Sequence, residues 1–236
     1  MSRLPIDDLP DTKAFAPADL VGPLNEVERK NAPDQLFVAG DPALLRRVPR
    51  VAIIGSRGAL EDGLRRAGRL ARLLTQRDAI VVSGLAAGID TAALEASIAA
   101  GGRVVGVIGT PLDEVYPKEN AALQLRMMRE HLVVSQFPQG HPVSRTNFPR
   151  RNRTMALLVH ASVIVEAGDT SGALSQGWEA LRLGRPLFLM KSLVDRADLS
   201  WPREMLDYGA VVLTRPEELL DSLPSHAGGG EARIAL

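Results

Sequence analysis

Short apolar runs rich in β-branched residues recur along the chain, and each is followed by a turn signal and then by a segment with helical spacing of apolar residues. The runs predict strands at Val51–Ile54, Ala79–Ser83, Val104–Ile108, Leu132–Ser135, Ser162–Glu166, Pro186–Leu189 and Ala210–Leu213. Strands that alternate with helices, and that are apolar over nearly their whole length, are typical of sheets covered on both faces. The pattern therefore predicts an α/β fold: a single domain with a doubly wound, mostly parallel sheet of the extended Rossmann-like type.

The chain divides into three parts. Residues 1–35 are rich in proline and charge, and we expect an extended or short-helical lead-in there. Residues 36–222 are expected to form the Rossmann-like domain, with Leu36–Val38 as a candidate additional strand. Residues 223–236 contain a Gly-Gly-Gly run and little periodicity, which indicates a flexible tail.

Composition narrows the function classes. The 236 residues, 45% of them hydrophobic, can bury a core of one large domain. The absence of cysteine excludes thiolate metal sites, and the four histidines lack metal-ligand spacing, so we expect neither a metal nor a cofactor. Because the chain start lacks a signal-peptide core and no apolar run approaches the roughly 20 residues that cross a bilayer, we expect a cytoplasmic protein without a membrane partner. The formal net charge is zero, so nucleic-acid binding would depend on where the charges lie.

Glycine-rich turns follow three of the expected strands, where a parallel sheet presents backbone amides to an anion. The candidate residues there are Gly55, Ser56, Arg57, Ser83, Gly84, Gly88, Asp90, Glu166, Ser171 and Gly172. A guanidinium beside such a turn, as at Arg57, can bind phosphate in a bidentate manner. Structural alternatives remain open: the glycines suit tight turns, Asp90 is better explained as a helix N-cap, and Ser171 or Asp169 could cap the next helix. Glu166 is either a ligand-facing acid or the anchor of an arginine.

Arginines gather in one acid-free stretch. No acidic residue occurs between His131 and Val165, whereas Arg145, Arg150, Arg151 and Arg153 fall within nine positions. Such charge runs are usually solvated faces, but here Asn147, Phe148 and Asn152 add hydrogen-bonding groups and a stacking surface. The stretch favours phosphate or nucleic-acid contact. If all four arginines met phosphates of one strand, the affinity would fall with salt at a logarithmic slope of roughly −3.

Five ordered motifs resemble the DNA-processing DprA/Smf family: VAIIGSR, VVSGLAAGID, VVGVIGTPLDEVYPKEN, FPRRNR and VIVEAGDTSGAL, across about residues 32–190. The resemblance implies a Rossmann-like domain that binds single-stranded DNA, dimerises and helps to load the RecA recombinase during natural transformation. It also implies a basic pocket of Arg57 with Arg150, Arg151 and Arg153, beside glycine-rich loops that contain Gly84, Gly88, Ser171 and Gly172.

Two alternatives to a non-enzymatic DNA-binding protein remain. The first is a nucleotide hydrolase that resembles the LOG phosphoribohydrolases, although the segment GDTSGALSQGWE lacks their Pro-Gly-Gly and Gly-Thr pattern and offers Glu179 as its acid. The second is a sensor of a nucleotide-derived ligand that uses the same strand-end loops. We expect no catalysis, because no Ser/His/Asp arrangement, paired carboxylates or metal cluster emerges from the sequence.

Overall fold

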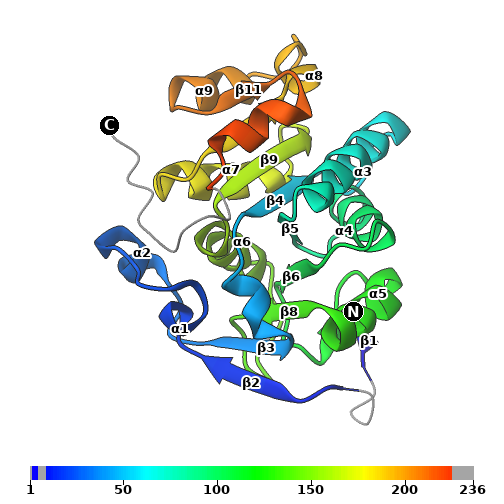
Figure 1. Ribbon diagram of the computed structural model, residues 1–236, viewed down its shortest axis with the longest axis vertical. Coiled ribbons are helices and arrows are strands. Elements are labelled where there is room, and N and C mark those ends of the chain that lie inside the picture. The colour runs from blue at the N-terminus through cyan, green and yellow to red at the C-terminus, as the bar shows by residue number, and fades with distance from the viewer. Residues whose placement is uncertain (1, 5–8, 225–236) are drawn as a thin grey trace.

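The computed structural model describes residues 2–4 and 9–224. Within these residues one sheet of nine strands runs through the molecule (Figure 1) in the order β11-β10-β9-β4-β5-β6-β8-β3-β2. Its strands are β2 Thr12–Phe15, β3 Leu36–Gly40, β4 Arg50–Gly55, β5 Ile80–Ser83, β6 Val104–Ile108, β8 Leu132–Ser135, β9 Ala161–Glu166, β10 Leu187–Met190 and β11 Val211–Leu213. All neighbours pair in parallel except β3 with β8 and β2 with β3. The predicted α/β class with a mostly parallel sheet is confirmed.

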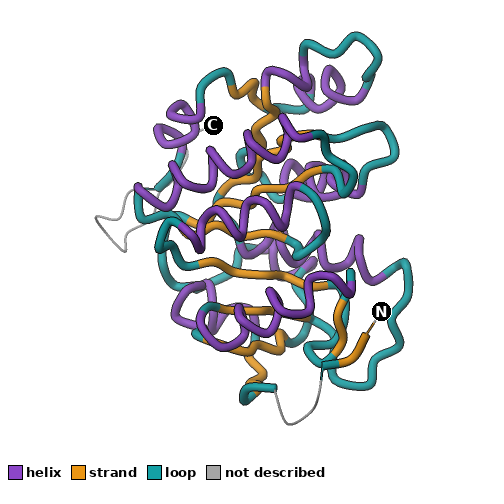
Figure 2. The backbone as a smooth tube through the Cα atoms, turned by 90° about the vertical axis from the view of Figure 1, so that its right-hand side faces the viewer, coloured by secondary structure: helices purple, strands orange, loops and turns teal. Residues whose placement is uncertain are grey.

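Helices cover both faces of the sheet. They are α1 Pro17–Val21, α2 Glu26–Asn31, α3 Glu61–Gln76, α4 Ile89–Ala99, α5 Ala121–Glu130, α6 Asn147–Leu158, α7 Gly172–Arg182, α8 Lys191–Val194 and α9 Trp201–Asp207, with short 3₁₀ helices η2 Pro42–Leu45, η3 Lys118–Asn120 and η4 Pro216–Ser222. One core lies between the sheet and α3, α4 and α5, and a second between the sheet and α1, α6, α7 and α9. Figure 2 looks from the side of the first core and shows helices in front of the strands. None of the helices in the described parts of the chain is long and apolar enough to cross a membrane.

The seven strands predicted from apolar runs all form, with ends that differ by at most one residue, and the candidate strand at Leu36–Val38 is β3. The lead-in contains the short helices α1 and α2, in line with our expectation of extended or short-helical structure, and it also adds the edge strand β2, which we did not predict. A separate antiparallel pair joins β1 Ser2–Arg3 to β7 Glu114–Val115. The predicted tail falls almost wholly outside the described residues, which end at position 224.

The order of the strands fixes where a ligand can enter. From β4 the chain builds outward through β5, β6 and β8, and it then returns to place β9 on the other side of β4. Loops that leave β4 and β9 therefore turn to opposite faces of the sheet, and they open a crevice at the carboxyl ends of these two strands.

Candidate functional site

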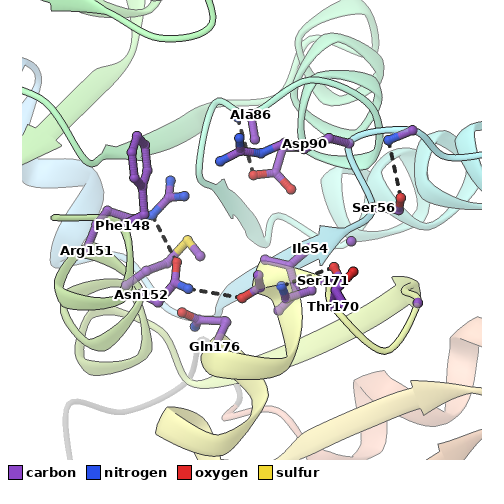
Figure 3. Close-up of a pocket in the computed structure, with 17 residues that line it drawn as sticks. Ile54, Ser56, Ala86, Asp90, Phe148, Arg151, Asn152, Thr170, Ser171 and Gln176 are labelled. Atoms are coloured by element: carbon purple, nitrogen blue, oxygen red, sulfur yellow. Dashed lines mark hydrogen bonds between the residues drawn. The ribbon is translucent and has the colours of Figure 1, made fainter. Parts of the chain in front are cut away.

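A cavity of about 480 Å³ lies at the carboxyl ends of β4 and β9, and we call it the strand-end cavity (Figure 3). Four segments meet there: the turn after β4, the loop after β5, α6, and the turn between β9 and α7. They supply Ile54, Gly55, Ser56, Arg57, Gly58, Ala86, Asp90, Phe148, Arg151, Asn152, Met155, Gly168, Thr170, Ser171, Gly172, Ala173 and Gln176. Nine residues predicted from the sequence are among them: Gly55, Ser56, Arg57, Asp90, Phe148, Arg151, Asn152, Ser171 and Gly172.

The turn after β4 is held tightly against its neighbours. Ser56 N–H donates to the Glu166 carbonyl at 2.7 Å, and Ile89 N–H donates to the Ser56 carbonyl at 3.2 Å. At Gly55 an added Cβ would lie 2.6 Å from the Ile89 side chain, so glycine is required there by close packing. The Ser56 hydroxyl accepts from Gly58 N–H at 3.2 Å, which shapes the next part of the turn. Close packing thus explains why this turn contains glycine, and the same turn also lines the cavity.

Asp90 does not cap α4, contrary to our preferred interpretation. The N-cap position belongs to Gly88, whose φ of 76° suits glycine, while Asp90 lies within the first turn. The Asp90 carboxylate instead accepts from Gly84 N–H at 3.0 Å and from Ala86 N–H at 3.4 Å, which fixes the loop after β5. Figure 3 shows Asp90 beside Ala86 at the cavity. Burial raises the pKa of this carboxyl, whereas Arg151 and the two amides act in the opposite direction.

Arg151, which we predicted as a phosphate contact, lines the cavity but is buried and held by the protein itself. Its Nη1 donates to the Gly84 carbonyl at 2.5 Å and to the Val107 carbonyl at 2.7 Å, and its Nε donates to Asn152. Burial lowers the pKa of this guanidinium, against the effect of the nearby Asp90 carboxylate. Arg151 thus sets the shape and the charge of the cavity wall rather than reaching outward.

The other arginines of the stretch diverge, because α6 advances roughly 100° per residue. The Arg150 guanidinium lies 5.2 Å from the centre of the Phe137 ring, and Arg153 forms an ion pair with Glu179 of α7 at 3.3 Å. Neither lines the strand-end cavity. The stretch itself is free of acidic residues, and the partner of Arg153 is distant in sequence, since Glu179 comes from a segment 26 residues away. The proposed pocket of four arginines is therefore not assembled; Arg57 and Arg151 are the two that line the cavity.

Arg57 has an aromatic environment at the cavity. Its guanidinium lies 5.2 Å from the Tyr116 ring centre and 5.5 Å from that of Phe148, and Nη1 donates to the Tyr116 hydroxyl at 3.1 Å. The two rings are 5.2 Å apart. Arg57 is exposed and forms no ion pair within the described residues. Tyr116 was not among our candidates, although it belongs to the segment VYPKEN that carries part of the family resemblance.

Several candidates act as supports. Asn147 is buried and hydrogen-bonds Ser144 and the Pro142 carbonyl, and Ser83 donates to the Ile53 carbonyl. Glu166 points to α3, where its carboxylate accepts from Leu60 N–H at 3.0 Å and lies 3.6 Å from Arg66. We considered Glu166 either as a ligand-facing acid or as the anchor of an arginine. The structure shows the second, with Arg66 as the arginine. These residues, like Gly84 and Gly88, do not line the cavity.

The start of α7 presents a helix N-terminus to the cavity. Ser171 is the N-cap and its hydroxyl accepts from Ala173 N–H, which confirms the capping prediction for this residue. Asn152 donates to the Gly172 carbonyl at 3.1 Å and ties α6 to this turn. Amides at a helix N-terminus carry partial positive charge, so this end of α7 favours an anion.

These features define a class: a Rossmann-like α/β protein with a strand-end cavity suited to phosphate groups. The family model of DNA recombination-mediator protein A matches residues 16–224. The chain therefore belongs to the DNA recombination-mediator protein A family.

Relatives agree with this assignment. The DNA processing protein DprA of Streptococcus pneumoniae is 34% identical over 207 residues, which cover 88% of this chain and 73% of that protein. DprA of Bacillus subtilis is 31% identical over 192 residues, which cover 81% of this chain but only 65% of that protein. The chain thus matches about two thirds to three quarters of the length of these curated relatives.

Solved structures share the fold. The X-ray structure of DprA from Streptococcus pneumoniae superposes with a TM-score of 0.78 at 30% identity, covering 92% of this chain and 76% of that one. A structure of DNA processing protein A from Helicobacter pylori, determined for its single-stranded DNA binding mode, gives a TM-score of 0.77 at 24% identity and covers 91% and 96% of the two chains.

Proposed function

We propose that this protein binds single-stranded DNA, without sequence preference and without catalysing a reaction, at the strand-end cavity. The observation that carries the proposal is Arg57, which is exposed, has no carboxylate partner and lies beside Tyr116 and Phe148. A guanidinium next to aromatic rings offers a phosphate contact and a stacking surface together. Every base has a π-face, so such a surface accepts any sequence.

The floor of the cavity supports the same proposal. The turn after β4 and the N-terminus of α7 both line the cavity, the first amides of α7 contribute partial positive charge, and Arg151 adds a fixed positive charge. The Helicobacter pylori protein, which has the same fold, was solved for its single-stranded DNA binding mode. Phosphate on the amides and bases on the aromatic rings would let a strand follow the rim of the sheet.

Replacing Arg57 tests the proposal. We expect Arg57→Gln to weaken binding to a fluorescent oligothymidine roughly ten-fold or more, because a charge-assisted contact is lost. The logarithmic salt slope should become shallower by about 0.7, the contribution of one phosphate on a single strand. The matched control is Arg77→Gln. Arg77 is exposed at the end of α3, shortly before β5 begins, and therefore lies at the amino ends of the strands, away from the strand-end cavity. Equal affinity of the two variants would contradict the proposal.

A sensor of a small nucleotide is the second candidate function, because a cavity of about 480 Å³ is within the size range of small-molecule sites.

A nucleotide hydrolase has less support than either binding function. Glu179, its candidate acid, accepts from both Arg153 and Arg182 and does not line the cavity. Incubation with nucleoside monophosphates followed by chromatography checks this, since release of free base would overturn the non-enzymatic proposal.

The proposal extends to partners. The family resemblance supports a homodimer and delivery of the bound strand to RecA in recombination and DNA uptake. Light scattering of the purified chain tests the dimer, and RecA filament assembly on coated single strands tests the delivery. A monomer, or unchanged filament assembly, would remove the respective partner while leaving DNA binding intact.

A further inference from the structure

A second cavity, of about 320 Å³, lies where β4 begins, and we call it the amino-end cavity. Its polar lining comes from Asp19, Arg46, Arg50 and His160. Since Arg50 opens β4 and Gly55 closes it, this cavity and the strand-end cavity lie at opposite ends of the same strand. Nothing proposed for the strand-end cavity uses it.

A buried guanidinium without a counter-ion forms its inner wall. Arg50 is only 5% exposed, its Nε donates to the Leu158 carbonyl at 2.7 Å, and its Nη1 donates to the Arg47 carbonyl at 2.7 Å. It forms no ion pair with any described residue. Arginine stays charged in proteins, and a buried charge is costly unless it is paired. The third guanidinium nitrogen, Nη2, has no protein acceptor in the described chain and remains available to an anion.

His160 adds a second donor. Its Nδ1 accepts from Arg50 N–H at 3.0 Å, so the neutral ring carries its proton on Nε2. Burial, Arg50 and Arg185 lower the pKa of His160 to about 3. Arg185 also lowers the pKa of Arg50, after burial, to about 10. Arg185 itself is paired with Glu28.

The remaining charged groups at the cavity are Arg46 and Asp19. The Arg46 side chain is exposed and donates to the Asp19 carbonyl at 3.2 Å. The exposed Asp19 carboxylate is occupied at the start of α1, where it accepts from Ala16 N–H at 3.3 Å. The side chains of Arg46, Arg50 and His160 thus offer hydrogen-bond donors to the cavity, and its volume of about 320 Å³ has room for an ion with several oxygens.

We propose that the amino-end cavity binds a small oxyanion of the phosphate class, held by Arg50, His160 and Arg46. The anion neutralises the buried guanidinium and accepts from His160 Nε2–H. The phosphate can be free or can be the 5′-terminal group of a DNA strand, and the two sources share the same chemistry.

Nuclear magnetic resonance of the histidine rings tests the proposal in the full chain. On titration with inorganic phosphate, against sodium chloride of equal ionic strength, we expect saturable shifts of the His160 ring signals and a rise in the His160 pKa. Signals are assigned with His160→Gln. In a parallel arm, a 5′-phosphorylated oligothymidine that shifts the ring while the 5′-hydroxyl form does not would identify a strand end as the source. If inorganic phosphate alone shifts it, the ligand is the free ion.

Three arginine variants separate phosphate binding from folding. Arg50→Gln should abolish the phosphate response, but it also removes hydrogen bonds that hold the chain at Leu158 and Arg47. Arg46→Gln changes an exposed side chain and should weaken phosphate binding about three-fold, whereas the neighbouring exposed Arg47→Gln, whose side chain does not line the cavity, should not. Absence of saturable His160 shifts in the unmodified protein, or equal responses of the Arg46 and Arg47 variants, would overturn the proposal and leave Arg50 with a structural role alone.

Discussion

At the scale of single residues, Arg151 is part of the scaffold of the strand-end cavity. It joins the loop after β5 to the end of β6 through the Gly84 and Val107 carbonyls, beside the buried Asp90. We expect Arg151→Leu to lower the free energy of unfolding by about 3–5 kcal/mol, because it leaves two buried carbonyls without their donor and removes the positive charge near the buried Asp90 carboxylate. Urea denaturation measures this loss. A stable Arg151→Leu variant that fails only in DNA binding would contradict the structural role.

His160 gives the protein a specific pH dependence. Its pKa is about 3 in the folded state, below the ordinary value near 6.5, so the unfolded chain binds more protons between these values. Stability should therefore be fully present above about pH 6.5 and be lost as the pH falls toward 3, at up to about 1.4 kcal/mol per pH unit from this group. Urea denaturation in phosphate-free buffers should show a shallower slope for His160→Gln. Identical slopes would mean that the ring titrates normally.

Single residues also show what the sequence could and could not predict. Arg57 and Ser171 were placed correctly in one cavity, because the apolar runs define the strand ends and the ends of parallel strands share an edge. The inward direction of Arg151 depends on how α6 is rotated against the sheet, which packing decides. Glu179 reaches Arg153 only through the contact of α7 with α6. The role of Tyr116 likewise depends on a loop that tertiary structure brings to Arg57.

At the scale of elements, the glycine turns divide into two kinds. An added Cβ at Gly88 would lie 2.3 Å from the Ser56 carbonyl, whereas one at Gly172 would meet no heavy atom within 4 Å. We expect Gly88→Ala to cost about 2 kcal/mol of stability, because its backbone conformation is also unfavourable for alanine.

Gly172→Ala should raise stability by about 0.4–1 kcal/mol, since it restricts the unfolded chain, yet weaken DNA binding by placing a methyl group at the cavity. Oligothymidine affinity and urea denaturation, measured on both variants, check this; unchanged affinity of Gly172→Ala would show that DNA does not approach the start of α7.

The elements that sequence patterns missed share a physical reason. The edge strand β2 is mostly exposed, and β1 and β7 contain two residues each, so none has the apolar run that identifies a buried strand. Their pairing comes from neighbours: β3 offers β2 an open edge, and the loop after β6 brings β7 to β1. The central strands were predictable because burial on both faces demands apolar residues throughout.

At the scale of the whole molecule, arginines line two cavities that lie at opposite ends of β4. The strand-end cavity opens where β4 and β9 finish, and the amino-end cavity lies where β4 begins. A formal net charge of zero hides this arrangement, since the acidic groups that balance the arginines lie largely elsewhere, several of them in surface ion pairs. Local placement of charge, rather than its sum, therefore supports a nucleic-acid ligand.

The most direct test of DNA binding is the affinity of the unmodified chain for thymidine monophosphate and for oligothymidines of increasing length, at two salt concentrations. Binding along a strand predicts that affinity rises with length and that the logarithmic salt slope steepens by about 0.7 for each added phosphate contact. If thymidine monophosphate bound as tightly as the longest oligonucleotide, with the same salt slope, the cavity would hold a single nucleotide and the proposed DNA-binding function would be wrong.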